Sequence, residues 1–143
     1  MHRHLASRIT AAVAGVLALA SVPYVASPGA AADAVTTTDG CLTSVPDPGT
    51  TAPVDICFTL FRPAGATKDR PVPMVLHSHG WGGSRTNDET AFRSWLDKGF
   101  GVLSFDQRGF GESGGKAHVD NPEFEGQDVI ALVDFVASLD WGA

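Results

Sequence analysis

The sequence predicts an α/β fold whose sheet is incomplete, and three observations lead to this prediction. Short apolar segments typical of strands alternate with segments of helical periodicity after residue 70. The composition is that of a folded protein, with 43% hydrophobic and 18% charged residues. A length of 143 residues fits one domain at most.

The first 34 residues have the features of an export signal. Arg3 and Arg8 are basic, residues 9–22 are apolar, and residues 30–32 or 32–34 offer small-residue cleavage sites. The apolar run is shorter than the roughly 20 residues that span a membrane. We therefore expect a secreted protein without membrane attachment after cleavage. The alternative is a buried helix rich in Ala and Leu.

Residues 35–54 are rich in Thr, Pro, Asp and Gly, which predicts a loop-rich entry to the domain. The two cysteines of the chain are Cys41 and Cys57. In an oxidising compartment we expect them to pair, and closing a loop of about 16 residues would stabilise the fold by about 3 kcal/mol. A zinc site would need more ligands at closer spacing, so no metal or cofactor is expected.

Three strands are predicted in the domain of residues 55–143. In residues 55–62, apolar side chains occupy both alternating sets, as in a strand covered on both faces. Residues 72–77 form a second strand with Pro73 near its start, where a missing amide donor is tolerated. Residues 101–105 form a third, short and apolar strand.

A first helix is predicted over about residues 88–98. Phe92, Trp95 and Leu96 fall on one of its faces, and Gly99 is placed to end it. The segment before this helix, residues 78–84, is a loop rich in Gly and Ser.

A second helix is predicted to begin with Asn121 as the N-cap and Pro122 at the first helical position. Asp128 and Asp134 are assigned to its polar face. Its buried stripe is predicted to comprise Val129, Ile130, Val133 and Val136. The order is strand, strand, helix, strand, helix, and the last helix needs another parallel strand to complete its crossover.

The segment RGFGESGG, residues 108–115, matches two catalytic patterns. Gly109, Gly111 and Gly114 fit G-x-G-x-x-G of dinucleotide-binding proteins, and Gly111, Ser113 and Gly115 fit G-x-S-x-G around a hydrolase nucleophile. Both patterns require a strand that turns directly into a helix. Residues 114–122 contain no helical run, so both interpretations are disfavoured.

We interpret Gly109, Gly111 and Ser113 instead as parts of a structural loop. The glycines allow positive φ in a tight loop. Asp106 and Arg108 are expected to tie it down, either by an ion pair or by bonds to its backbone amides.

The order of motifs resembles the α/β-hydrolase superfamily. HSHGWGG, residues 77–83, follows one strand, and DQRGFGES, residues 106–113, follows the next and looks like the D-x-R-G-x-G-x-S loop of that fold. Residues 140–142 are similar to the segment before the nucleophile strand in X-prolyl dipeptidyl-peptidases and cocaine-esterase-like hydrolases. The resemblance implies the N-terminal portion of an α/β-hydrolase sheet, with the nucleophile and the triad acid and histidine beyond Ala143.

The resemblance also implies one catalytic element within the chain. By position, Gly80 lies in the oxyanion loop and the backbone amide of Trp81 is an oxyanion-hole donor. The other interpretation of Trp81 is that its side chain lines the mouth of a pocket, and both interpretations can hold because the first uses only the backbone. Members of the cocaine-esterase group often use a tyrosine side chain here, but the sole tyrosine, Tyr24, lies in the signal, which favours a backbone-only hole. His77 and His79 are expected to stabilise the loop.

The expected function is therefore that of a secreted serine hydrolase acting on small ester or peptide substrates, with this sequence as its N-terminal part. The alternative is a non-catalytic exported α/β domain or fragment. The net charge of −6 and the lack of a basic run beyond the first residues argue against a nucleic-acid partner.

Overall fold

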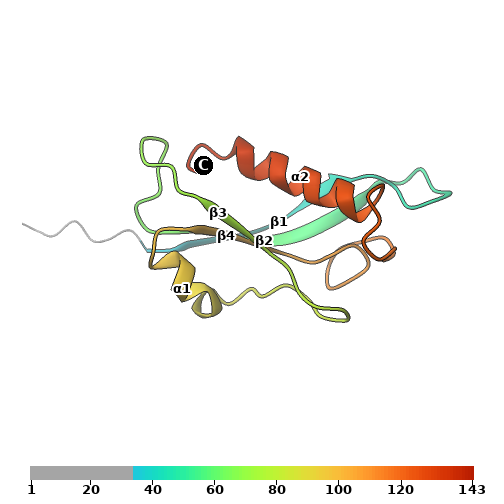
Figure 1. Ribbon diagram of the computed structural model, residues 1–143, viewed down its shortest axis with the longest axis horizontal. Helices are drawn as coiled ribbons and strands as arrows, with labels where there is room; N and C mark the ends of the chain where they lie inside the picture. The colour runs from blue at the N-terminus through green and yellow to red at the C-terminus, as the bar shows by residue number, and fades with distance from the viewer. Residues whose placement is uncertain (1–33) are drawn as a thin grey trace, which may run out of the picture. The chain divides into compact units, whose positions relative to one another are not determined.

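The computed structural model describes residues 34–143, which form a four-stranded mixed sheet flanked by helices (Figure 1). The strands are β1 Thr36–Ser44, β2 Val54–Arg62, β3 Met74–His77 and β4 Gly101–Phe105. They lie in the order β1-β2-β4-β3, in which only β3 and β4 are parallel. The predicted export signal lies, apart from Ala34, outside the described residues.

Helices lie on both faces of the sheet (Figure 1). On one face a 3-10 turn, η1 Glu89–Phe92, continues into one α-helical turn, α1 Arg93–Leu96. The other face carries the longer helix α2 Glu125–Ser138. No helix within residues 34–143 has the length and apolar character needed to cross a membrane.

Two apolar clusters fill the space between the sheet and its helices. The larger one, beneath α2, comprises Val54, Ile56, Phe58, Leu60, Ala66, Leu103, Phe105, Leu132, Val136 and Trp141. The smaller one, beneath α1, comprises Phe61, Phe92, Leu96 and Val102. Neighbouring residues such as Leu60 and Phe61 belong to opposite clusters because side chains alternate along a strand. The prediction that β2 is covered on both faces is confirmed.

The prediction of a loop over residues 35–54 is wrong for residues 36–44, which form β1. β1 pairs with β2 along nine residues, from Thr36 opposite Arg62 to Ser44 opposite Val54. It is an edge strand whose residues are mostly exposed, so it lacks the apolar alternation that identifies a strand in a sequence. Cys41 lies opposite Cys57, and the predicted disulfide joins them.

The first helix is shorter than predicted. Asp88 caps η1, its carboxylate accepting a hydrogen bond from the Thr90 amide, and Gly99 has φ +83° at the end of the segment. Phe92 and Leu96 are buried as expected, whereas Trp95 is partly exposed and packs edge-on against Phe100.

The predicted start and buried stripe of the second helix also need correction. α2 begins at Glu125, and Asn121 caps the preceding turn, its side-chain oxygen accepting from the Glu123 amide at 2.8 Å. The buried residues of α2 are Asp128, Leu132 and Val136. Of the predicted stripe, Val129, Ile130 and Val133 are between 44% and 51% exposed.

An ion pair explains why the buried face of α2 is rotated about the helix axis relative to the predicted stripe. Asp128, assigned to the polar face, is 3% exposed because it binds the buried Arg108. Turning Asp128 inward moves the neighbouring Val129 toward solvent, since successive residues are about 100° apart on a helix. Asp134 is exposed, as predicted.

The residues after α2 begin to pair with the free edge of β3. Gly142 forms a parallel bridge with Val72, supported by bonds from Val72 N–H to the Trp141 carbonyl at 2.9 Å and from Ala143 N–H to the Val72 carbonyl at 2.8 Å. One parallel bridge therefore follows α2, at the place where the sequence requires a further parallel strand.

Candidate functional site

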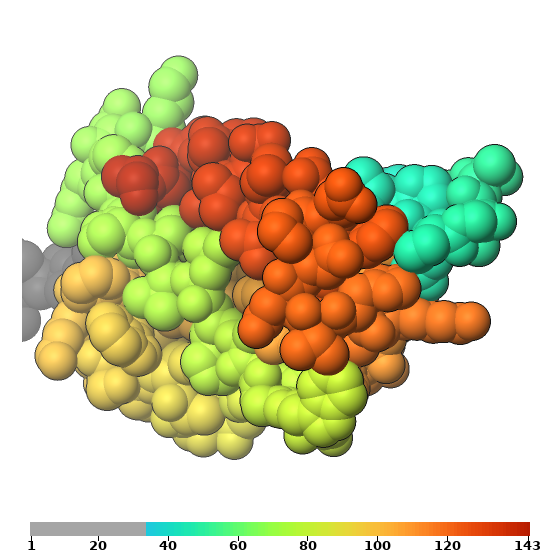
Figure 2. Space-filling model, turned by 45° about the vertical axis from the view of Figure 1, so that its right-hand side comes forward, coloured from blue at the N-terminus to red at the C-terminus, as the bar shows by residue number. Residues whose placement is uncertain are grey.

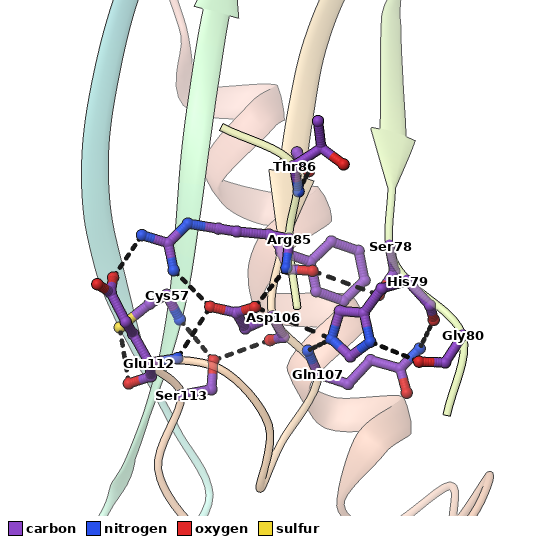
Figure 3. Close-up of polar contacts among 12 residues, drawn as sticks. Cys57, Ser78, His79, Gly80, Arg85, Thr86, Asp106, Gln107, Glu112 and Ser113 are labelled. Atoms are coloured by element: carbon purple, nitrogen blue, oxygen red, sulfur yellow. Dashed lines mark hydrogen bonds and ion pairs between the residues drawn. The ribbon is translucent and has the colours of Figure 1, made fainter. Parts of the chain in front are cut away.

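The candidate site lies where β3 and β4 end. These strands are parallel, so the loops after His77 and Phe105 leave the sheet at the same edge. Ligands of open α/β sheets bind at the carboxyl ends of the strands. Figure 3 shows that polar contacts join the two loops at this edge.

Residues 80–83 form a tight turn in the first loop. The Gly83 amide donates to the Gly80 carbonyl at 3.0 Å, and Gly82 has φ +76°. A type II turn requires positive φ at its third residue. Trp81, the second residue of the turn, is 73% exposed, and its amide forms no hydrogen bond with any residue of the described range 34–143. This N–H can therefore donate to a ligand.

His79 and Gln107 hold the start of this turn against the second loop. The Gln107 amide donates to His79 Nε2 at 3.2 Å, and the Gln107 side chain donates to the His79 carbonyl at 3.1 Å. His79 Nδ1 lies 2.8 Å from the Gly80 carbonyl. Because Nε2 accepts and Nδ1 faces a carbonyl, the neutral ring carries its proton on Nδ1. His79 thus stabilises the loop. His77, at the end of β3, instead packs edge-on against Phe92 of η1.

Asp106 and Arg85 hold the end of the first loop (Figure 3). The buried Asp106 carboxylate accepts the Arg85 amide at 2.6 Å, pairs with the Arg85 guanidinium, and accepts the Glu112 amide at 3.0 Å. Arg85 also binds the Glu112 carboxylate at 2.5 Å. Gly111 passes so close to Asp106 that a Cβ there would overlap the carboxylate. The sequence predicts that the loop is held either by an ion pair or by bonds to its backbone amides, and Asp106 makes a bond of the second kind.

Ser113 is bound into the sheet. Its hydroxyl accepts the Cys57 amide at 2.8 Å and donates to the Asp106 carbonyl at 2.8 Å. The residues around it are a turn and irregular loop, with neither a strand ending directly before it nor a helix beginning after it. The hydroxyl closes the loop against the end of β2.

The predicted ion pair between Asp106 and Arg108 is not formed, because Arg108 points into a separate buried cluster. Its guanidinium binds both oxygens of Asp128, at 2.6 and 3.0 Å, and Asp47 at 2.9 Å. It also donates to the Val45 carbonyl at 2.9 Å. One fully buried cation therefore joins the β1–β2 loop, the loop after β4 and helix α2.

These contacts shift the ionisation of the carboxylates. Burial alone would raise the pKa of Asp106, but the hydrogen bonds from the Glu112 amide and from Arg85 outweigh it and lower the pKa below its usual value. For Asp47, burial opposes and the bonds from Arg108 prevail, so its pKa is lowered too. Both carboxylates are therefore anions at neutral pH.

The partners Arg85, Gln107, Asp47 and Asp128 were not recognised as site residues in the sequence. Arg85 and Asp106 are 21 residues apart, and Arg108 and Asp47 are 61 apart. No local spacing encodes such pairs. Within residues 34–143, no group of three His, Cys, Asp or Glu side chains is arranged to hold a metal ion.

Comparison with known proteins places the chain in a family. The profile of the X-Pro dipeptidyl-peptidase (S15) family matches residues 53–143. No curated protein matches the chain in a sequence search.

Solved structures share the fold. A hypothetical protein from Pseudomonas aeruginosa is 22% identical, with a TM-score of 0.55 over 76% of this chain and 32% of its own. Est1E from Butyrivibrio proteoclasticus, solved with ferulic acid, is 19% identical, with a TM-score of 0.51 over 70% of this chain and 39% of its own. An esterase of Pyrococcus furiosus is 19% identical, with a TM-score of 0.51 over 73% of this chain and 39% of its own. The chain thus spans between 32% and 39% of the length of these proteins, and the predicted N-terminal portion of an α/β-hydrolase fold is confirmed.

Proposed function

The chain belongs to the X-Pro dipeptidyl-peptidase (S15) family, and we propose that it is the N-terminal part of a secreted serine hydrolase that cleaves ester or peptide bonds by acyl transfer. Its role in catalysis is to supply an oxyanion-hole donor, the backbone N–H of Trp81. The family suggests X-Pro peptides as the first peptides to test. The esterases among the structural neighbours suggest simple esters.

The observation that carries this proposal is the Trp81 amide, which has no hydrogen-bond partner among residues 34–143 and lies in a loop fixed on both sides. Before Trp81, His79 is held by Gln107, and after it, Arg85 is held by Asp106. An N–H that is fixed before the reaction stabilises a developing oxyanion without reorganisation during the reaction. Removing one such donor typically lowers the rate by about 10² to 10³.

In this proposal the nucleophile comes from a further strand that would continue from the bridge at Gly142. With Gly142 opposite Val72, about five more residues at one-to-one parallel pairing would bring the strand level with His77. A serine at the end of that strand would lie beside the Trp81 amide. It would attack the substrate carbonyl with an imidazole as base, and water would then hydrolyse the acyl-enzyme.

A non-catalytic exported domain is the competing proposal. The position of Ser113 is compatible with this competing proposal. Its hydroxyl is occupied by bonds to Cys57 and Asp106, so Ser113 is not placed to act as a nucleophile. The two proposals differ in whether a serine of the full-length protein reacts with a fluorophosphonate probe. Labelling at a serine beyond residue 143 supports the hydrolase, and labelling at Ser113, or no labelling of folded protein, contradicts it.

A pair of substitutions at Trp81 tests the oxyanion role directly. Trp81→Pro removes only the N–H from the backbone, and proline suits the second position of a type II turn, so the turn should form. Trp81→Ala keeps the N–H and removes the indole. We expect Trp81→Pro to lower kcat for methyl acetate about 100-fold and Trp81→Ala to lower it far less. Equal losses would show that the amide is not the donor.

A further inference from the structure

A cavity of about 280 Å³ opens beside the Trp81 turn, between the loop after β4 and the start of α2. Its apolar wall consists of Trp81, Phe105, Phe110, Ala117, Val119 and Val129. Figure 2 shows the yellow-green surface of the loop near residue 80 adjoining the orange surface of residues 110–125. A cavity of about 150 Å³ holds benzene, so this one has room for one ring with short substituents.

Three side chains of this wall are unusually exposed for their type. Trp81 is 73% exposed, Val119 66% and Val129 44%, although they come from three separate segments. Single exposed apolar residues are ordinary, but several around one hollow are typical of a binding site. Trp81 is held in place by an edge-on contact with Phe110 at 5.1 Å between ring centres.

The backbone at the cavity mouth is strained. Val119 and Asp120 have φ values of +55° and +54°, and a branched side chain such as Val119 rarely adopts positive φ. Backbone strain of this kind clusters at ligand sites. Glu125 fixes both ends of the strained pair, accepting the His118 amide at 2.5 Å and the Asn121 amide at 3.1 Å.

The charges that line the cavity are mostly negative. Asp120, Glu125 and Asp128 face a single cation, Arg108, which is already paired with Asp128. Burial would raise the pKa of Glu125, but the bonds from the His118 and Asn121 amides lower it, so Glu125 is an anion at neutral pH. A carboxylate ligand would be repelled here.

We propose that this cavity binds an uncharged apolar group of about one aromatic ring, carried by the substrate next to the scissile bond. The inference rests on the proposed function, because Trp81 supplies both the oxyanion amide and part of the cavity wall. The cavity then selects esters or amides with a ring-sized neutral substituent over acetyl-sized ones and over carboxylated analogues.

The test uses the full-length protein and three esters: methyl acetate, methyl benzoate and benzyl acetate, followed by acid release at constant pH. Val129→Trp fills the cavity, whereas Ile130→Trp places the same side chain on the next, half-exposed position of α2, outside the cavity wall. The ring lies on the acyl side of methyl benzoate and on the alcohol side of benzyl acetate. We expect Val129→Trp to lower kcat/KM for one of these two esters at least tenfold relative to methyl acetate. Ile130→Trp should leave that ratio unchanged.

A second variant covers the case in which Val129→Trp does not fold. Val119→Gly removes a wall side chain and also relieves the positive φ, so it should not lower Tm. It should lower the preference for the ring-bearing ester severalfold. An unchanged preference in Val119→Gly contradicts the proposal.

The charge of the cavity is tested with monomethyl terephthalate, the carboxylated analogue of methyl benzoate. Wild type should have a higher kcat/KM for methyl benzoate than for monomethyl terephthalate. Asp120→Asn should reduce the ratio of these two values about two- to fivefold, and the reduction should be smaller at high salt. An unaltered ratio at all salt concentrations would contradict the charge argument.

The outcomes separate the two proposals. Failure of the folded wild type to hydrolyse any of the esters, or any X-Pro peptide, contradicts the proposed function. Hydrolysis of methyl acetate with equal losses for all esters in Val129→Trp contradicts the cavity while the function stands. A fall in Tm or yield with Val129→Trp, together with an unchanged ester preference in Val119→Gly, would mean that another part of the protein packs there.

Discussion

Two charged clusters flank the loop after β4, and they differ in what surrounds them. The cluster of Arg108, Asp128 and Asp47 is almost entirely out of solvent and joins three segments of chain. The cluster of Asp106, Arg85 and Glu112 has a buried carboxylate at its centre but an exposed one at its rim. Asp106 and Arg108 are only two residues apart, yet each belongs to a different cluster.

The difference indicates separate tasks. The Arg108 cluster anchors α2 and the β1–β2 loop, so its removal should mainly affect folding. The Arg85 cluster fixes the loop that carries Trp81, so its removal should affect the proposed reaction more than the fold. The following variants test this division, from the largest expected effect to the smallest.

Asp128→Ala should have the largest effect. It leaves the Arg108 guanidinium buried with fewer acceptors, and breaking such a pair typically destabilises a protein by about 3–5 kcal/mol. Urea unfolding followed by circular dichroism measures the loss. Asp134→Ala, exposed on the same helix, is the control and should change the free energy of unfolding by less than about 0.5 kcal/mol. Equal losses of unfolding free energy in Asp128→Ala and Asp134→Ala would contradict the anchoring role of the Arg108 cluster.

Arg85→Ala should destabilise less, by about 2 kcal/mol, because the Asp106 carboxylate retains two backbone amides. We expect a larger relative effect on the reaction, with kcat about tenfold lower and KM little changed, since a shifted loop misplaces the Trp81 donor. Arg85→Lys should restore part of the kcat. The control, Arg93→Ala, removes two surface ion pairs, with Glu89 and Asp97, and should alter neither quantity. A rise in KM alone would contradict the positioning role.

Ser113→Ala should have a smaller effect again. The hydroxyl bonds to Cys57 and Asp106 are lost, at about 1–2 kcal/mol, while most ester hydrolysis remains. Thermal unfolding and ester kinetics on the same sample measure both quantities. Abolished turnover with unchanged stability would identify Ser113 as the nucleophile and overturn the structural assignment.

Acidification tests both clusters together and should have little effect above pH 5. The pKa values of Asp47 and Asp106 are lower in the folded state than the unfolded value of about 3.9. The stability that they contribute is therefore complete above the unfolded pKa and is lost as pH falls through the folded pKa. Asp47→Asn should flatten the decline of unfolding free energy below about pH 5. A slope identical to wild type would exclude Asp47 as a contributor.

Local patterns predicted most of the fold. β2 and β4 contain dense apolar runs, and Gly99 ends its helix where the pattern indicated. β1 escaped prediction because its residues face solvent at the sheet edge, and its strand character comes from pairing with β2. The buried stripe of α2 was predicted wrongly because helical periodicity contains no information about Arg108, which draws Asp128 into the interior.

By itself, the sequence determined the order of the elements from β2 to α2 and the two loops that carry the hydrolase motifs, because short-range periodicity and turn residues encode them. It also determined the disulfide pair, because the chain has only two cysteines. Only the tertiary structure decided which charges pair and which face of α2 is buried. It also decided that, in the part of the chain that the structure describes, the Trp81 amide has no hydrogen-bond partner and lies beside an apolar cavity. Those outcomes depend on contacts between residues 20 to 61 positions apart, for which burial and geometry, rather than local spacing, select the partner.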